Sequence, residues 1–262
     1  MPRGITLTDS AIIERRLWTP KVLNPIIWLD AADRSSFEFG TSNQVSNWKD
    51  KGSSQSSFTQ ATSGSQPSLV ENSQNYLPGV NFQTGTKYLQ GASTIWSSPP
   101  ISAFIVVKVN GAGYQGFIET SVSTGLGLGY SAALAYAIFR NNVQDFASNL
   151  PKVGTDIVTY NTTGIDIGTA STTVSFRRNG TNGAYSVFPT GIATTGTSTI
   201  GAYLNGANDP LNGILYEIVI ANRLDLNLQY KTEAYLAWKW GLQSSLTIDH
   251  PYRFQLPLID IG

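Results

Sequence analysis

Residues 213–222 read Gly-Ile-Leu-Tyr-Glu-Ile-Val-Ile-Ala-Asn, and this stretch near the C-terminus decides the fold. Successive side chains of an extended strand point to opposite faces, so the even-numbered residues from 214 to 220 share one face. Both faces are largely apolar, whereas a strand that is exposed on one side carries polar residues there. The sequence therefore predicts a central strand that is covered on both faces.

A helix is predicted directly after this strand, over about residues 226–240. Asp225 is a favourable N-cap residue, and Gly241 is suited to the left-handed conformation that commonly ends a helix. A helix rich in aromatic residues is expected to dock on a sheet or on a partner, with Trp238 or Trp240 as its anchor. Its apolar residues recur at helical spacing and form one stripe, which consists of Leu228, Tyr235, Trp238 and Leu242.

Many short segments upstream have the apolar pattern of strands, and the longest is Ile101–Val109. The Asn-Gly pair at 179–180 predicts a hairpin. Residues 44–75 are rich in Ser, Gln, Thr and Asn and are predicted to form long surface loops. The full set of predicted strands is 26–29, 80–82, 88–90, 101–109, 116–120, 125–130, 135–139, 156–161, 172–178, 199–202 and 213–221. The expected fold class is all-β, with two antiparallel sheets and one C-terminal helix.

Composition fits one large β domain with a surface that carries few charges. The chain has 262 residues, of which 41% are hydrophobic and 13% are charged, and its formal net charge is zero. The charged fraction lies well below the usual value of about a quarter. Basic residues cluster only at Arg15-Arg16 and Arg177-Arg178, so the electrostatic footprint of a nucleic-acid-binding protein is missing.

Cysteine and apolar runs limit the remaining classes of protein. The chain has no cysteine, which excludes disulfides and thiolate metal sites. No run of eighteen apolar residues occurs, so no transmembrane helix and no membrane partner are expected. Residues 1–9 lack the apolar core of a signal peptide. We therefore expect a protein that is made in the cytoplasm and assembled without secretion.

The chain is predicted to divide into an N-terminal arm (1–24), a sandwich (25–246) and a C-terminal tail (247–262). Apolar residues stand in both end segments, which are too short to build a core of their own, so exposure would favour association. The alternative is that both segments fold back onto their own sandwich as extra strands. We predict that the following residues are assembly contacts with neighbouring proteins: Ile12, Ile13, Leu17, Trp18, Phe254, Leu256, Leu258 and Ile261.

Several segments carry a resemblance to a known family. Trp28-Leu-Asp-Ala-Ala-Asp-Arg-Ser-Ser36 looks like its opening strand and turn, and Val45-Ser-Asn-Trp-Lys-Asp-Lys-Gly52 looks like its following segment. Further matching segments stand in order at 66–67, 79–82, 87–89, 235–242 and 250–252. On these residues, which span about 26–253, the chain resembles the laminin-G-like, concanavalin-A-like β-sandwich of bacteriophage structural proteins.

The resemblance implies a jelly-roll sandwich with extended arms and a structural role in a virion that is assembled in the host cytoplasm. The implied role is a capsid decoration or cement protein, or a small tail or baseplate component. Its partners would then be major capsid or tail proteins, with the chain as a homo-oligomer or symmetric array. The alternative function is a carbohydrate-binding module for host surface recognition, with Trp96 and Tyr203 on predicted loops as glycan contacts.

Catalytic and metal sites are predicted to be absent. Related sandwich glycosidases place two acidic residues two or four apart on one strand, and Glu217 stands alone on its strand. We therefore predict no enzymatic activity. The single histidine, His250, is expected to dock the tail. No cofactor is predicted, although the resemblance implies a rim Ca²⁺ site, for which the candidates are Asp50, Asp156, Asp166 and Asp209; each also suits a turn cap.

Overall fold

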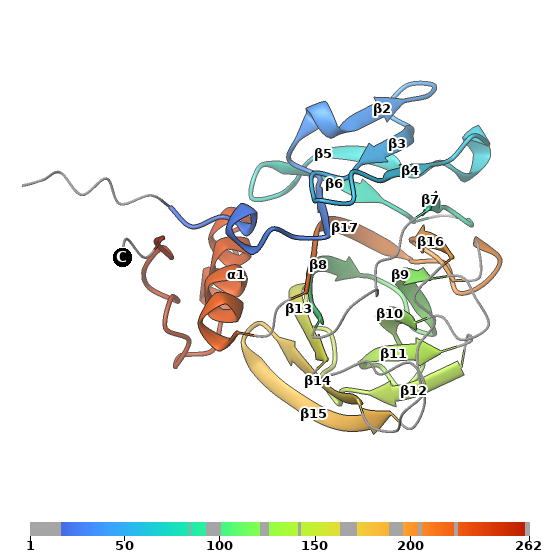
Figure 1. The fold of residues 1–262 in the computed structure, drawn as a ribbon. Coiled ribbons are helices and arrows are strands. Elements are labelled where there is room, and N and C mark those ends of the chain that lie inside the picture. The colour runs from blue at the N-terminus through green and yellow to red at the C-terminus, as the bar shows by residue number, and fades with distance from the viewer. Residues whose placement is uncertain are drawn as a thin grey trace, which may run out of the picture.

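The computed structural model describes residues 17–83, 85–92, 101–120, 126–140, 143–162, 172–188, 196–203, 206–222 and 225–259. The protein is built mainly of strands, in two antiparallel sheets that pack into a sandwich, with one α-helix (Figure 1). The predicted all-β, two-sheet fold class is thus confirmed.

One sheet has eight strands in the order β15-β14-β13-β8-β17-β6-β5, and β1 also pairs with β17. Every pairing in it is antiparallel. Its strands are β1 (Ile27–Asp30), β5 (Ser68–Gln74), β6 (Leu77–Asn81), β8 (Ile101–Val109), β13 (Thr155–Thr162), β14 (Thr172–Arg178), β15 (Thr181–Phe188) and β17 (Gly213–Ala221).

The other sheet has nine strands in the order β12-β11-β10-β9-β16-β7-β4-β3-β2. These strands are β2 (Phe37–Phe39), β3 (Val45–Lys49), β4 (Ser57–Thr59), β7 (Leu89–Ala92), β9 (Gln115–Thr120), β10 (Leu126–Tyr130), β11 (Tyr136–Arg140), β12 (Val143–Ala147) and β16 (Thr197–Ile200). Short 3-10 turns complete the described elements: η1 (Pro20–Leu23), η2 (Arg34–Ser36), η3 (Ser63–Ser65) and η5 (Gln243–Ser245).

The strand β17 is central, as its two apolar faces predict. Along one edge it pairs with β8 over its whole length. Its other edge is divided between β6, at Ile214 and Leu215, and β1, which pairs with residues 217–220. A β-bulge in the pairing with β8 lies between Leu215 and Glu217 and interrupts the strict alternation of faces.

The helix α1 (Leu226–Lys239) covers the face of the eight-stranded sheet that is turned away from the second sheet (Figure 1). The predicted ends are confirmed: the Asp225 carboxylate accepts a hydrogen bond from Leu228 N at 2.9 Å, and Gly241 follows with φ of 69°. The anchor is Trp240, which is fully buried, whereas Trp238 is only partly buried. The face of α1 that is buried against the sheet also carries polar residues. They are tolerated there because residues of the sheet supply hydrogen-bond partners for them.

The prediction of long surface loops over residues 44–75 is wrong, since β3, β4 and β5 lie there. These strands bury Val45, Trp48 and Phe58 between polar neighbours. Single apolar residues in Ser- and Thr-rich sequence give too little alternation to be recognised as strands. The Asn179-Gly180 hairpin is confirmed, because both residues have positive φ in the turn that joins β14 to β15.

The two ends of the described chain meet beside α1 (Figure 1). Leu17 and Leu258 form an antiparallel bridge, and Trp18 N donates to Pro257 O at 3.0 Å. Trp18 and Leu23 are buried in the core. Residues 17–24, which the sequence assigns to the arm, therefore belong to the packed body, and so does the tail at least as far as the bridge.

Candidate functional site

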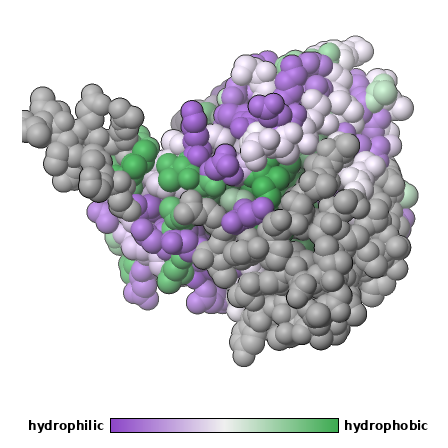
Figure 2. Space-filling model, in the orientation of Figure 1, coloured by the Kyte–Doolittle hydropathy of each residue, from purple (hydrophilic) through white to green (hydrophobic). Residues whose placement is uncertain are grey.

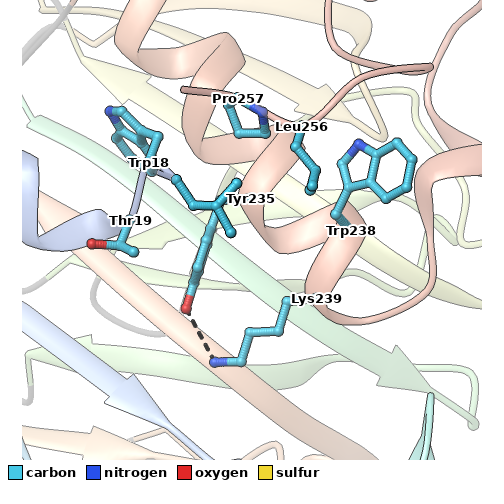
Figure 3. A pocket seen from close by; sticks show the side chains of 8 residues that line it. Trp18, Thr19, Tyr235, Trp238, Lys239, Leu256 and Pro257 are labelled. Atoms are coloured by element: carbon cyan, nitrogen blue, oxygen red, sulfur yellow. Dashed lines mark hydrogen bonds between the residues drawn. The ribbon is translucent and has the colours of Figure 1, made fainter. Parts of the chain in front are cut away.

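A hollow of about 280 Å³ lies where the N-terminal segment, α1 and the tail meet. Figure 3 shows the side chains of Trp18, Tyr235, Trp238 and Leu256 around it. Apart from the indoles of the tryptophans and the phenol of Tyr235, the polar side chains in its wall are those of Thr19 and Lys239. The complete lining, called the terminal surface below, is Leu17, Trp18, Thr19, Tyr235, Trp238, Lys239, Leu256 and Pro257.

Three contacts hold the terminal surface in place. The bridge between Leu17 and Leu258 fixes the two chain segments against each other. The ring of Trp18 meets that of Tyr235 edge to face, with 6.2 Å between centroids. Trp238 Nε1 donates to the carbonyl of Tyr252 at 3.0 Å, which orients its indole toward the tail. The wall of the hollow is therefore formed by contacts within this chain and needs no partner.

Several apolar side chains remain exposed here. Leu17 is 55% exposed and Leu256 is 45% exposed, while Phe254, two residues along the tail, is 74% exposed. Figure 2 shows apolar surface gathered where the N-terminal segment joins the body. Apolar residues that cluster at a hollow commonly mark an interaction site.

A buried charge cluster lies beneath this surface. Lys239 Nζ donates to Asp30 Oδ1 at 2.6 Å, to Glu217 Oε2 at 2.7 Å and to the Tyr235 hydroxyl at 3.3 Å (Figure 3 draws the last of these). Glu217 also accepts from the indole nitrogens of Trp28 and Trp240, each at 2.8 Å. Burial raises the pKa of Glu217, and the ammonium of Lys239 opposes this.

Asp30 and Glu217 form a carboxylate pair that sequence reasoning missed. They are directly opposite each other in the register of β1 and β17, so their side chains share one face of the sheet. The two acids lie on different strands, and Glu217 follows Trp28 of β1 by 189 residues, so no spacing within one strand reveals the pair. Neither carboxylate lines the hollow, and both are engaged by Lys239, so the pair fastens the end of α1 to the sheet.

A second buried cluster fastens the other part of α1 and the tail. Glu233, fully buried on α1, accepts from Arg177 Nε at 2.8 Å and from Thr159 Oγ1 at 2.8 Å. His250 Nε2 lies 3.2 Å from Glu233 Oε2. Burial alone would raise the pKa of Glu233, but the hydrogen bond of His250 and the charge of Arg177 outweigh it and lower the pKa. The prediction that His250 docks the tail is confirmed.

A second hollow, of about 370 Å³, opens beside Trp28 on the other side of η1. Asp50 shapes its wall, because its carboxylate accepts from Trp28 N at 2.6 Å and from Gly52 N at 2.7 Å. Lys51 Nζ lies 4.4 Å from the centre of the Trp28 ring. The residues around this hollow are Lys21, Asn24, Pro25, Trp28, Lys51, Gly52 and Ser53.

The predicted assembly contacts fall into three groups. Leu17 and Leu256 lie at the terminal surface and are exposed, and Phe254, two residues before Leu256 in the sequence, is exposed as well. Trp18, predicted to reach a neighbour, is instead 2% exposed, because it packs on its own chain; Leu258 is half-buried at the bridge. Outside the described residues lie Ile12, Ile13 and Ile261, together with the predicted glycan contact Trp96.

Tyr203, the other predicted glycan contact, is instead fully buried. Its ring packs on Phe139 with 4.9 Å between centroids. Gly127 and Gly129 of β10 make room for it, since a Cβ at either position would lie within 2.5 Å of the Tyr203 side chain. Gly127 and Gly129 therefore admit an aromatic ring, and Tyr203 offers no surface to a glycan.

The candidate calcium ligands are separate from one another. The carboxylate of Asp50 caps its own loop, and Asp156 is buried with bonds from Tyr136 Oη at 2.6 Å and Asn179 Nδ2 at 2.7 Å. Asp209 is half-buried in a turn, and Asp166 lies outside the described residues. Within the described part of the chain, no three His, Cys, Asp or Glu residues are grouped to hold a metal, and no helix could span a membrane.

No protein-family model and no curated protein matches the sequence. Solved structures with a similar arrangement include a sialidase from Trypanosoma rangeli, at 14% identity and a TM-score of 0.48, where 77% of this chain covers 31% of that one. The same enzyme with 2,3-difluorosialic acid as a covalent intermediate is 11% identical with a TM-score of 0.48, and the match covers 85% of this chain and 34% of that one. A mutant of the NanB sialidase from Streptococcus pneumoniae is 13% identical with a TM-score of 0.40, and the match covers 56% of this chain and 26% of that one. The chain thus spans about a third or less of these sialidases.

These neighbours correct one expectation. The sequence predicts a protein without enzymatic activity, whereas the structures similar to it are those of enzymes. That prediction is not retained. Identities of 14% or less and TM-scores below 0.5 assign no activity and no substrate to this chain.

Proposed function

We propose that this protein is a structural component of a larger particle and that the terminal surface binds it to a neighbouring protein. The observation that carries the proposal is an apolar hollow with a preformed wall, edged by the exposed Leu17 and Leu256. The sequence resemblance adds the kind of particle, a bacteriophage virion, with a capsid or tail protein as neighbour.

The chemistry of the terminal surface suits a protein partner. Aromatic and aliphatic anchors that enter apolar pockets dominate the energies of protein interfaces. Tyr235 and Trp238 present rigid rings, and the wall positions them through contacts with Trp18 and the tail. Little conformational entropy would be lost on binding, since these side chains are already held.

A charge introduced at the terminal surface tests this role. Leu256→Glu introduces a charge at the rim of the hollow, and Val153→Glu, at an exposed residue that does not line it, is the matched control. Particles produced from the genome that encodes the chain are purified, and their protein content is measured by mass spectrometry. We expect the Leu256→Glu protein to be lost from the particles at an unchanged melting temperature. Particles that never contain the unmodified chain would refute the role.

We propose carbohydrate recognition as a second function, because the hollow beside Trp28 has the chemistry of a sugar site. Lys51 Nζ lies 4.4 Å from the centre of the indole ring, so the apolar C–H face of a pyranose ring could cover only the part of the indole that the ammonium leaves open. Lys21, Asn24 and Ser53 have no side-chain hydrogen bond to any described residue, so their polar groups are available to hydroxyls. Lys51 is already paired with Asp30 and Asp33, which favours a neutral ligand over a polyanion.

Titration with methyl glycosides of glucose, galactose, mannose and N-acetylglucosamine tests this second function. The indole N–H signal of Trp28 is followed by NMR, because Trp28 Nε1 already has a defined bond to Glu217. Ser53→Phe would fill the hollow from an exposed position, and Lys108→Ala is a control at an exposed lysine outside it. We expect millimolar binding by at least one glycoside that Ser53→Phe abolishes. Unchanged spectra with all four would exclude a neutral sugar.

A further inference from the structure

We propose that the terminal surface is occupied by residues 5–13 of a second copy of this chain, so that two copies exchange their N-terminal segments. This inference rests on the proposed function, because it names the partner that the same surface would bind. It concerns the hollow at Trp238 and does not involve the hollow beside Trp28.

The place where the described chain begins gives the first reason. Leu17 is both the first described residue and a part of the hollow's rim. Sixteen residues precede it, and four of them have the aliphatic side chains that an apolar hollow accepts: Ile5, Leu7, Ile12 and Ile13. The chain thus carries a candidate occupant directly beside the site.

The direction of the chain at the bridge points away from the hollow of the same copy. Leu17 pairs with Leu258 in antiparallel sense, so Trp18 and Thr19 run alongside Pro257 and Leu256, and these four residues line the hollow. A segment that continued the antiparallel pairing before Leu17 would run toward Ile259, on the other side of the bridge from the hollow. Return to the hollow would need a reversal within residues 14–16.

Those three residues do not suit a reversal. They read Glu-Arg-Arg and include no Gly, Pro, Asn, Asp or Ser, which are the residues that tight turns favour. An extended chain advances roughly 3.3 Å per residue, so an extended run from Leu17 back to Ile13 would span about 13 Å. In our proposal such a run takes the aliphatic residues away from their own hollow and brings them within reach of that of a neighbour.

Exchange between two copies would also give a closed assembly that does not grow beyond a dimer. Each copy would give one segment and receive one, which is the isologous arrangement of a two-fold dimer. Such an arrangement covers the exposed Leu17 and Leu256 of both copies at once. It accounts for apolar residues in two segments that are far apart in sequence and meet at one place in the fold.

Sedimentation equilibrium of the purified full chain tests the exchange. We expect a dimer for the full chain and for the Val153→Glu control, and a monomer for Leu256→Glu and for a chain that lacks residues 1–16. At a concentration at which both proteins are monomeric, the truncated chain should melt at the same temperature as the full chain, because every buried residue of the described body remains. A peptide of residues 1–16 should bind the truncated chain, and Ile12→Glu with Ile13→Glu in the peptide should weaken binding by about tenfold or more.

Two outcomes would overturn the proposal. A full chain that stays monomeric at all concentrations excludes exchange, even if the peptide binds the truncated chain, since the segment would then sit on its own copy. A dimer that survives removal of residues 1–16 excludes the segment as the occupant. Loss of Leu256→Glu from particles, together with either outcome, would leave the assembly role standing and refute only the identity of the partner.

Discussion

The carboxylate of Glu217 accepts a hydrogen bond of 2.8 Å from the indole nitrogen of Trp240. Glu217 belongs to the central strand β17, and Trp240 is the C-cap residue of α1, so this bond joins the end of the helix to the middle of the sheet. The same carboxylate oxygen receives Lys239 Nζ at 2.7 Å. Two adjacent residues of α1 are therefore fixed to one buried acid.

Trp240→Ala should destabilise the protein by about 3–5 kcal/mol, the usual cost of removing a large buried ring. Trp240 is fully buried and its ring lies 5.2 Å from that of Tyr216. Trp238→Ala is the matched control and should cost less, because Trp238 is only partly buried. Urea unfolding of both variants measures the difference. Equal losses for the two variants would show that α1 is not anchored through Trp240.

Glu233→Gln should destabilise the protein at neutral pH by about 3–5 kcal/mol, because Arg177 would be left buried without its charge partner. The pKa of Glu233 is lowered in the folded state, so its ionised form contributes stability above the ordinary pKa of about 4.5. That contribution disappears as pH falls through the lowered value. The difference in unfolding free energy between the two proteins should therefore shrink between pH 6 and pH 3, and a constant difference would contradict the assignment.

Glu217→Gln should show the opposite dependence on pH. Burial raises the pKa of Glu217, so ionisation weakens its contribution to stability as pH rises from about 4.5 through the raised value. The loss of stability caused by Glu217→Gln should consequently be larger near pH 4 than at pH 7. Thermal unfolding at both pH values measures this. A loss that grows with rising pH would mean that Lys239 dominates and that the pKa is not raised.

The central strand, the helix and the fold class could be predicted because their signals are local. Alternation in residues 213–221 and the caps at Asp225 and Gly241 depend only on near neighbours in sequence. The strands β3, β4 and β5 escaped prediction, because each buries few apolar residues among polar ones. Their pairing depends on strands elsewhere in the sheet, and one sequence does not reveal it.

The candidate sites were predictable only in part, for the same reason. Leu17 and Leu256 stand out as apolar residues near the chain ends, but their meeting at one hollow depends on the bridge to Leu258. The charge clusters of Glu217 and Glu233 join residues from separate strands and the helix. Such a cluster has no characteristic spacing along the chain, whereas a helix cap or a hairpin turn does have a characteristic spacing.

Gly52→Ala should destabilise the protein by roughly 1–3 kcal/mol through overpacking. A Cβ at position 52 would lie 2.5 Å from the carbonyl oxygen of Ile26, and backbone atoms cannot easily move aside. The change should also disturb the hollow beside Trp28, which Gly52 lines. Gly64→Ala is the control, since a Cβ there meets nothing within 4 Å. Equal melting temperatures for the two variants would contradict the close approach.

Two truncations separate the arm from the body. Removal of residues 1–24 takes away Trp18 and Leu23, which are 2% and 5% exposed, and also the edge-to-face contact of Trp18 with Tyr235. Since each large buried side chain contributes several kcal/mol, the loss should be about 5 kcal/mol or more, which is a large part of the stability of a typical domain. Removal of residues 1–16 spares both side chains and the bridge to Leu258, so it should leave the melting temperature unchanged at a protein concentration at which the full chain is monomeric. Circular dichroism during heating compares the two proteins with the full chain. If the shorter truncation melted as early as the longer one, the packed body would have to begin before Leu17.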